Sequence, residues 1–268
     1  MADTIEPRDQ TESQDASISL MPLRNLIERV DYAMSRDKAR PNLHGVFLEH
    51  DGDTLLAVAT DGHRLARASE ASFPLELPKG GAILSANGIK GLKAALPRRR
   101  TKWPRSLMHG TVHVDEKNLV LEVGGREHRL ELADGWFPDY RQIIPDLSDR
   151  PTHLHRMRSA QLAELAEVLG KITESHIVRV EIADDGIVLT AEQDVAGGYR
   201  SVKGSGRIPA CAAKGATFYI NARYLAQALH ALPGDIEFYP PSDERGLKPI
   251  TIRHAMTHEL ALIMPRVI

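Results

Sequence analysis

Two segments of the chain, 136 residues apart, repeat one pattern of helix-capping and apolar residues. The first reads SANGIKGLKAALP (85–97), and the second reads NARYLAQALHALPG (221–234). In each, a Ser or Asn that can cap a helix precedes apolar residues three and four positions apart, and Leu-Pro follows. Ile89, Leu92 and Leu96 correspond to Leu225, Ala228 and Leu232. The repeat predicts that the chain contains units built alike.

Two further amphipathic helices are expected, from Leu23 to Met34 and from Ser159 to Leu169. Short runs that alternate in polarity follow the helices, such as TLLAVAT (54–60) and VRVEIAD (178–184). Such runs are typical of antiparallel strands that bury one face. The sequence therefore predicts an α+β fold with two similar domains, each made of two helix-plus-antiparallel-strand units.

The expected domain boundaries follow from composition. Residues 1–17 carry five acidic side chains and almost no large apolar ones, so we expect a disordered acidic tail. The two domains should span 18–140 and 141–268. Between them, the segment 133–151 contains Pro138, Pro145 and Pro151, which exclude a long helix and favour an extended connector.

The composition places limits on the class of protein. The chain has 268 residues, 42% of them hydrophobic, and a formal net charge of −2. Cys211 is the only cysteine, so no intrachain disulfide is possible, and no run resembles a secretory signal or a membrane span. These features favour a cytoplasmic protein. The basic run PRRRTKWPR (97–105) is either a solvated loop or a loop that contacts phosphates.

The stretch LLAVATDGHRLARAS (55–69) predicts a β-hairpin. Residues alternate in polarity on both sides of Asp61-Gly62, and an Asp-Gly pair is a strong turn signal because glycine tolerates positive φ. The tip should then present the imidazole of His63 and the guanidinium of Arg64.

The chain carries no motif typical of an enzyme. It lacks a phosphate-binding G-x-x-x-x-G-K-[ST] loop, an H-E-x-x-H helix and any pair of cysteines. Asp51-Gly52-Asp53 lies between strand-like runs, where turn chemistry explains it better than paired catalytic carboxylates. We therefore expect no catalytic residues, no metal site and no cofactor.

Three segments carry a resemblance to a known family. VATDGHRLA (58–66), FPDYRQIIP (137–145) and LIMPRVI (262–268) resemble, in this order, the signature segments of the bacterial DNA polymerase III β sliding clamp. The resemblance covers residues 18 to 268 and matches only the second and third of the three domains of that clamp. It implies a non-enzymatic processivity factor for DNA replication, in which a ring encircles double-stranded DNA without reading its sequence.

The resemblance also implies a cleft that receives short peptides from DNA polymerases and clamp loaders. By position, its residues would be Leu43, Thr60, Gly62, His63, Arg64, Leu65, Pro138, Ile143, Pro249, Leu262, Ile263, Met264 and Pro265. Met264 suits an adaptable apolar pocket, and Arg64 would form a polar rim. Gln142 and the ending Arg266-Val267-Ile268 depart from the family pattern, so we expect a different peptide preference. Tyr140 should serve packing between the domains.

The resemblance further implies a ring of six domains, which two domains per chain would complete as a homotrimer; a dimer or a monomer remains an alternative. The candidate phosphate contacts are Arg24, Arg29, Lys38, Arg40, Lys90, Lys93 and Arg223. Glu164 and Glu167 make the third helix acidic, so contact with DNA should be either uneven around the pore or weak.

Two other functions stay open at the level of sequence. One is a clamp-like adaptor or competitor that binds polymerase peptides without encircling DNA. The other is a nuclease on an α+β fold, which the missing catalytic residues disfavour.

Overall fold

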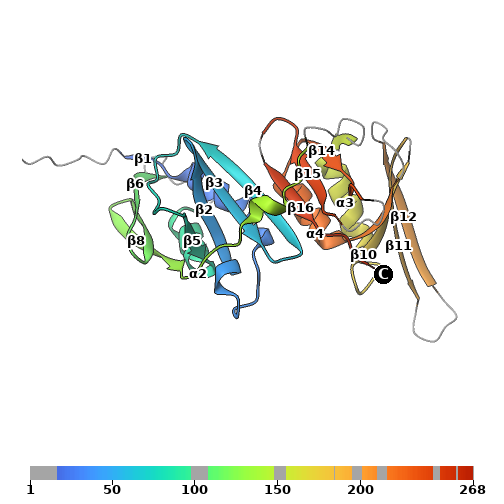
Figure 1. The fold of residues 1–268 in the computed structure, drawn as a ribbon, viewed down its shortest axis with the longest axis horizontal. Helices are drawn as coiled ribbons and strands as arrows, with labels where there is room; N and C mark the ends of the chain where they lie inside the picture. The colour runs from blue at the N-terminus through green and yellow to red at the C-terminus, as the bar shows by residue number, and fades with distance from the viewer. Residues whose placement is uncertain are drawn as a thin grey trace, which may run out of the picture.

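The computed structural model describes residues 17–97, 108–147, 155–183, 185–194, 201–209, 216–243, 248–257 and 259–267. The expected acidic tail, apart from residue 17, and nearly all of the basic run 97–105 lie outside these ranges. The chain forms two lobes placed side by side, with the connector crossing the front of their junction (Figure 1).

Each lobe is built from two units in which a strand and a helix precede three strands. The first lobe consists of β1 (Ile18–Ser19), α1 (Met21–Glu28), β2 (Gly45–Asp51), β3 (Thr54–Thr60) and β4 (Arg64–Ala71), then β5 (Ala82–Ser85), α2 (Ala86–Ala95), β6 (His109–Val114), β7 (Asn118–Val123) and β8 (Arg126–Ala133). The short 3-10 turns η1 (Asp31–Ala33) and η2 (Pro41–Leu43) lie between α1 and β2.

The second lobe repeats this order. It consists of β9 (His155–Arg158), α3 (Ser159–Leu169), β10 (Ile177–Ala183), β11 (Gly186–Asp194) and β12 (Ser201–Pro209), then β13 (Thr217–Asn221), α4 (Ala222–Ala231), β14 (Asp235–Tyr239), β15 (Ile250–His254) and β16 (Leu260–Ile263). The structure therefore confirms the predicted α+β fold with helix-plus-antiparallel-strand units.

The repeated helices α2 and α4 begin and end alike. The Ser85 side chain accepts a hydrogen bond from the amide of Gly88, and the Asn221 side chain accepts from the amides of Arg223 and Tyr224. At the other end, Leu96 and Leu232 leave the helical region with nearly equal dihedral angles (φ −119° and −114°, ψ 76° and 66°). The capping pattern read from the sequence is thus present at both ends of both helices.

The first helix is shorter than expected. The prediction of one helix from Leu23 to Met34 is wrong, because α1 ends at Glu28 and a 3-10 turn occupies Asp31–Ala33. The predicted apolar face is nevertheless buried, with Leu23, Leu26, Ile27 and Val30 fully inaccessible. After the helix ends, Tyr32 packs against the cores of both lobes.

The two lobes share one continuous sheet. Its strand order is β1-β6-β7-β8-β5-β2-β3-β4-β16-β15-β14-β9, and the remaining four strands form a second sheet of order β12-β11-β10-β13. The junction between the lobes is the antiparallel pair β4–β16, with Leu65 opposite Leu262 and Arg64 opposite Ile263. Strand edges, rather than a flexible linker alone, therefore hold the lobes together.

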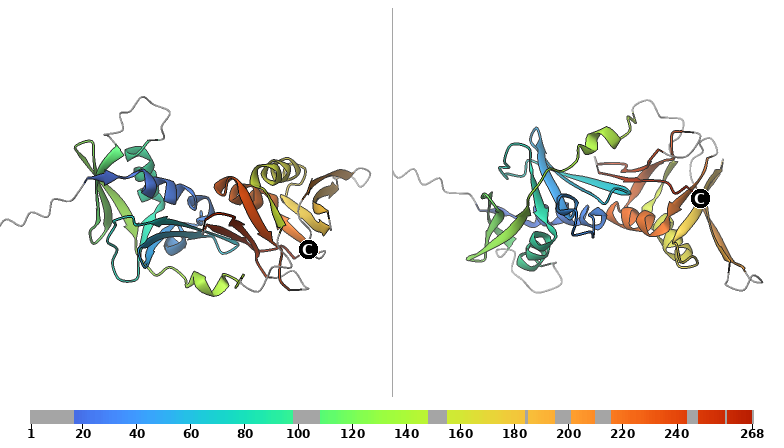
Figure 2. Two further views of the ribbon diagram at one scale, coloured as in Figure 1. Left: turned by 90° about the horizontal axis from the view of Figure 1, so that it is seen from above. Right: turned by 60° about the horizontal axis from the view of Figure 1, so that its bottom comes forward.

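Within the described residues, the α-helices α1 to α4 lie on one side of the molecule and the connector lies on the other (Figure 2). Within the connector, η4 (Tyr140–Ile143) buries Tyr140 among side chains of both lobes, including Leu65 and Leu262. Phe137 stacks on Phe47 with ring centroids 4.8 Å apart. Tyr140 is therefore a packing residue between the lobes, as expected.

Candidate functional site

The hairpin predicted at Asp61-Gly62 forms the tip between β3 and β4. Gly62 has a φ of 91°, which a side chain would strain. The Thr60 hydroxyl donates to the carbonyl of Arg64 (2.6 Å) and accepts from the amide of Gly62 (3.1 Å), while Asp61 Oδ1 accepts from the amides of His63 and Arg64. The tip is therefore held rigidly by its own side chains, and His63 is left exposed.

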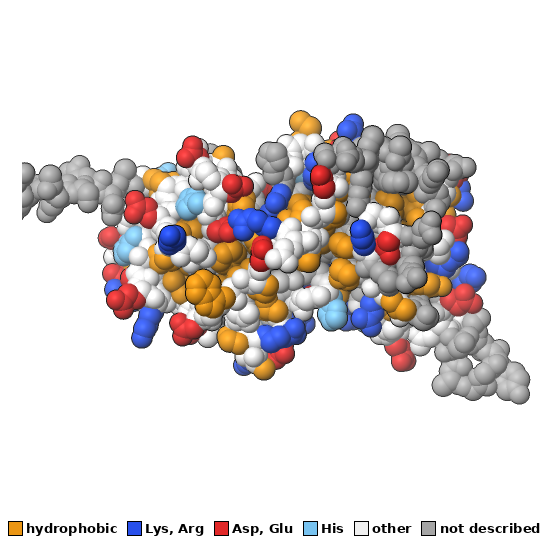
Figure 3. Space-filling model, viewed as in Figure 1, with side chains coloured by type: hydrophobic (Ala, Val, Ile, Leu, Met, Phe, Trp, Pro, Cys, Tyr) orange, Lys and Arg blue, Asp and Glu red, His pale blue; other side chains and the backbone are white. Residues whose placement is uncertain are grey.

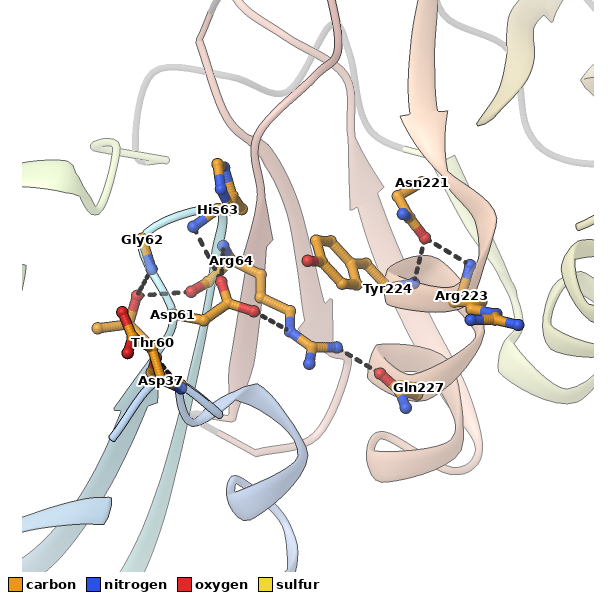
Figure 4. A network of polar contacts seen from close by, with 11 residues as sticks. Asp37, Thr60, Asp61, Gly62, His63, Arg64, Asn221, Arg223, Tyr224 and Gln227 are labelled. Atoms are coloured by element: carbon orange, nitrogen blue, oxygen red, sulfur yellow. Dashed lines mark hydrogen bonds and ion pairs between the residues drawn. The ribbon is translucent and has the colours of Figure 1, made fainter. Parts of the chain in front are cut away.

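Arg64 does not form an exposed rim, contrary to the expectation from sequence. It is 8% exposed, and its guanidinium reaches across the junction from the hairpin tip to α4 (Figure 4). There it donates to Gln227 Oε1 and lies 4.2 Å from the ring centroid of Tyr224, while its Nε is 3.0 Å from Asp61 Oδ2. Arg64 is thus a contact between the lobes.

Two hollows, of about 420 and 510 Å³, lie on the helix side of this junction. The larger one, about 510 Å³, lies beside Arg64 and is lined by residues of the hairpin tip, the 34–40 loop and α4, among them Arg36, Arg40, Arg223 and Gln227. It shares only His63 and Arg64 with the predicted cleft. It is a polar hollow and not the apolar peptide cleft that the resemblance implies.

The C-terminal segment lies against the hairpin tip, although about 200 residues separate the two in sequence. β16 pairs with β4, and one residue later the amide of Met264 donates to the carbonyl of His63 (2.8 Å). Pro249 immediately precedes Ile250, which pairs with Ile263. The structure therefore brings together Thr60, the hairpin tip and residues 262–264.

The residues of the predicted cleft divide into buried and exposed sets. The buried set, whose members are all at most 9% exposed, consists of Leu43, Thr60, Arg64, Leu65, Leu262 and Ile263. Ile263 belongs to the core of the second lobe. The exposed set consists of Gly62, His63, Pro138, Ile143 and Met264, with Pro249 and Pro265 partly exposed. An incoming side chain can therefore reach Met264 and Ile143 directly, whereas Ile263 already packs inside the lobe.

The connector side, on which Ile143 lies, has a mixed surface. Charges of both signs alternate with scattered hydrophobic side chains over both lobes (Figure 3). Ile143 is 50% exposed and Met264 is 38% exposed. Trp136, at the start of the connector, is 86% exposed and lies beside a separate hollow lined by Phe47, Lys79 and Lys117.

The candidate phosphate contacts also separate into two groups. Arg24 is 5% exposed, pairs with Glu28 at 2.9 Å and donates to the carbonyl of Lys93, so it is removed from the candidates. Lys93 pairs with Asp31, and Arg29 pairs with Glu259.

The remaining cations are better placed for a ligand. Lys38, Lys90 and Arg223 are exposed, and Arg40 is exposed in a surface pair with Asp37. Lys90 lies on α2 and Arg223 lies on α4, on the helix side of the molecule. On α3 the surface is acidic, with Glu164 exposed and Glu167 bonded to His230.

Sequence reasoning missed Tyr224 and Gln227 as partners of Arg64. Both occupy half-buried positions of an ordinary amphipathic helix, and nothing local marks them. Within the described ranges there is no cluster of three metal-binding side chains, and no helix there is long and apolar enough to cross a membrane.

Comparison with known proteins agrees with this geometry. Residues 17–139 match the family model described as DNA polymerase III beta subunit, central domain. This part of the chain is therefore similar to the beta sliding clamps. It is 31% identical to the beta sliding clamp of Vibrio cholerae over 182 residues, which is 68% of this chain and 47% of the relative. Against the beta sliding clamp of Synechocystis it is 26% identical over 229 residues, or 81% of this chain and 57% of the relative.

The solved sliding clamps have the same fold. A Pseudomonas aeruginosa clamp superimposes with a TM-score of 0.78 at 23% identity, covering 94% of this chain and 66% of that one. A Thermotoga maritima DNA polymerase III beta subunit gives 0.76 at 23% identity, covering 98% and 70%. The chain spans about half the length of the curated relatives it matches. The match to the structures supports two clamp lobes in one chain.

Proposed function

We propose that this chain is a DNA sliding clamp that encircles duplex DNA and tethers DNA polymerases and clamp loaders through a peptide-binding cleft at the junction of its lobes. The observation that carries the proposal is the contact of the hairpin tip with the C-terminal segment, at the Met264–His63 hydrogen bond, within a sliding-clamp fold.

The cleft would accept apolar side chains over Met264 and Ile143. Both are exposed; Ile143 ends the turn that buries Tyr140 in one cluster with Leu65 and Leu262, and Met264 follows the buried Ile263. A rigid floor with an adaptable methionine at its edge suits short peptides of varied sequence. A Pseudomonas aeruginosa sliding clamp of the same fold has been solved bound to griselimycin, which supports a ligand-binding surface on this fold.

Duplex DNA would pass along the helix side, where phosphates meet Lys38, Arg40, Lys90 and Arg223. Contacts restricted to phosphates allow sliding because they carry no sequence information. The acidic surface of α3 makes these contacts uneven. Six lobes would complete a ring, so two lobes per chain call for a homotrimer. In this proposal the protein is a cytoplasmic, non-enzymatic processivity factor.

The cleft is tested by Met264→Asp. A charge at this position should weaken binding of a synthetic clamp-binding peptide from a bacterial DNA polymerase at least tenfold. The reason is that an apolar contact of this size is worth about 1.5–3 kcal/mol. The matched control is Val267→Asp, which changes a residue that is 81% exposed. Truncation from Met264 onward is a poorer test, since the amide of Arg266 also donates to the carbonyl of Tyr219. Equal peptide affinity of both variants and the parent would refute the cleft assignment.

A second function, an adaptor that binds polymerase peptides without encircling DNA, is favoured by the acidic surface of α3. It predicts equal retention on linear and circular duplex, whereas a ring is lost from linear ends. A nuclease is disfavoured because the described residues contain no group of three side chains that could hold a catalytic metal. An assay for cleavage of DNA in the presence of divalent metals tests this function directly.

A further inference from the structure

Two long strand edges in the described part of the chain have no ladder partner. β12 pairs only with β11 and ends the smaller sheet. β8 pairs with β7 along Arg126–Glu131, but on its other side it meets β5 only at Leu132 and Ala133. Open edges of this length are templates for pairing with another chain, and proteins normally cover them.

The junction inside the chain shows how such edges pair. Each lobe repeats the same order of units, so β12 of the second lobe corresponds to β4 of the first, and β8 of the first lobe corresponds to β16 of the second. β4 and β16 are the strands that join the lobes. The two open edges are therefore the counterparts of the two edges already joined.

Corresponding residues follow from the ladders. Ser85 and Asn221 both cap helices and pair with Gly45 and Ile177 respectively. Following each ladder outward from these pairs makes Val202 of β12 the counterpart of Arg64.

The other strand is aligned in the same way. Ile83 pairs with Ala133, and its counterpart Tyr219 forms a bridge with Arg266. Leu130 of β8 is then the counterpart of Ile263, and both side chains are buried in the core of their lobe.

We infer that β12 of one chain pairs antiparallel with β8 of a second copy, with Val202 opposite Leu130 and Lys203 opposite Arg129. This inference rests on the proposed ring and names the surfaces that close it.

The helix side of this junction is suited to Val202. In the chain, Arg64 lies against Tyr224 and Gln227 of α4, whose counterparts on α2 are Gly88 and Gly91. Gly91 is half-buried, and a Cβ there would meet only the flexible end of Leu130. Packing within the chain therefore gives little reason for glycine at position 91 in mid-helix, where it costs about 1 kcal/mol relative to alanine. Gly88, by contrast, is buried, and a Cβ there would collide with the backbone carbonyl of Glu131. Val202, 48% exposed in one copy, would lie over this smooth surface of the next.

The opposite side of the junction is charged. Lys203 lies 3.4 Å from Glu192, and Arg129 lies 2.8 Å from Asp115 and 2.7 Å from Glu127. Each of these two cations is thus paired with carboxylates of its own lobe, which limits the repulsion between Lys203 and Arg129. The corresponding positions within the chain are Leu65 and Leu262, both buried. The junction between copies is consequently more polar than the junction within the chain, and it should dissociate on dilution.

The test is disulfide formation between Arg129→Cys and Lys203→Cys introduced together in a Cys211→Ser background. Side chains directly opposite in an antiparallel pair are close enough for a disulfide after small adjustments. Mild oxidation should give a covalent trimer on a non-reducing gel. The matched control pairs Arg129→Cys with Arg207→Cys, two exposed positions on the same strands but four residues out of register, and it should remain uncrosslinked.

Measuring the mass of the reduced variants distinguishes failure of the β8–β12 pairing from failure of the proposed ring. A trimer that crosslinks through neither pair, or better through the control pair, would overturn the pairing of β8 with β12 while the ring stands. A protein that remains monomeric at all concentrations would overturn both.

A second variant checks the surface without a crosslink. Val202→Asp should raise the concentration needed for half-assembly at least tenfold, since it places a charge against the glycine surface of α2. Val168→Asp, at an exposed valine on α3 outside both edges, should leave assembly unchanged. Equal assembly of both variants would contradict the inference.

Discussion

Arg64 shows how one residue can be mistaken when only its neighbours in sequence are known. It lies two residues after a turn glycine, where an exposed guanidinium is the ordinary expectation, yet it is buried between Tyr224 and the hairpin tip. We predict that Arg64→Ala lowers the free energy of unfolding by about 1.5–3 kcal/mol, because Gln227 and Asp61 lose a charged hydrogen-bond partner. Arg64→Lys should recover only part, since lysine lacks the planar group that stacks on tyrosine. Urea denaturation measures the free energy of unfolding of both Arg64 variants. The control is Arg40→Ala, which removes an arginine from an exposed ion pair. Equal stability of the Arg64→Ala and Arg40→Ala variants would contradict a stabilising role of Arg64 at the junction.

Glu237 is the residue through which pH should act on the second lobe. It is 3% exposed; burial tends to raise its pKa, but hydrogen bonds from Arg253 and Tyr239 outweigh this and hold the pKa below its usual value. A lowered folded-state pKa stabilises the protein above about pH 4.3 and loses that effect as pH falls further. Glu237→Gln should therefore destabilise at pH 7 by about 1–3 kcal/mol, and by progressively less below pH 4. Thermal unfolding across pH tests this, with Glu181→Gln in an exposed pair as control; a deficit independent of pH would argue against the carboxylate.

At the scale of elements, the equivalent caps of α2 and α4 make a paired prediction. Ser85→Ala and Asn221→Ala should each lower the free energy of unfolding by about 1 kcal/mol, because each leaves helix amides without an acceptor. Ser85 also donates to Glu131 Oε2 of β8 at 2.9 Å, so its loss should be the larger of the two. Asn25→Ala, on the exposed surface of α1, should be neutral or slightly stabilising. If neither substitution changed the free energy of unfolding, tertiary packing alone would determine where these helices begin.

At the scale of the whole molecule, the helix side should carry the contact with DNA. Lys90→Glu with Arg223→Glu should reduce retention on circular duplex and flatten its salt dependence, since each lost phosphate contact removes about 0.9 from the slope of log affinity against log salt. Lys79→Glu with Lys117→Glu makes the same change of charge beside the connector and should have little effect. Lys93 is unsuitable for such a test because it pairs with Asp31. Equal loss in both double variants would show that net charge, not the helix side, governs retention.

The sequence by itself determined the features that local chemistry specifies. Capping residues and apolar spacing placed α2, α3 and α4, and the Asp-Gly pair placed the hairpin tip, because turns and helix ends are decided within a few residues. The repeated pattern predicted units of the same build for the same reason. The resemblance of three short segments anticipated that the hairpin tip and the C-terminus would meet.

Only the tertiary structure decided which of those residues remain accessible. Leu65 and Ile263 are buried at the β4–β16 junction. Arg24 is enclosed by Glu28 and the carbonyl of Lys93. Helix α1 ends before Tyr32, whose side chain packs against the cores of both lobes. Each outcome depends on a partner far along the chain; Arg64 and Gln227 are 163 positions apart. Burial is a property of the surfaces that meet, and the local sequence encodes the shape of one surface but not the identity of the other.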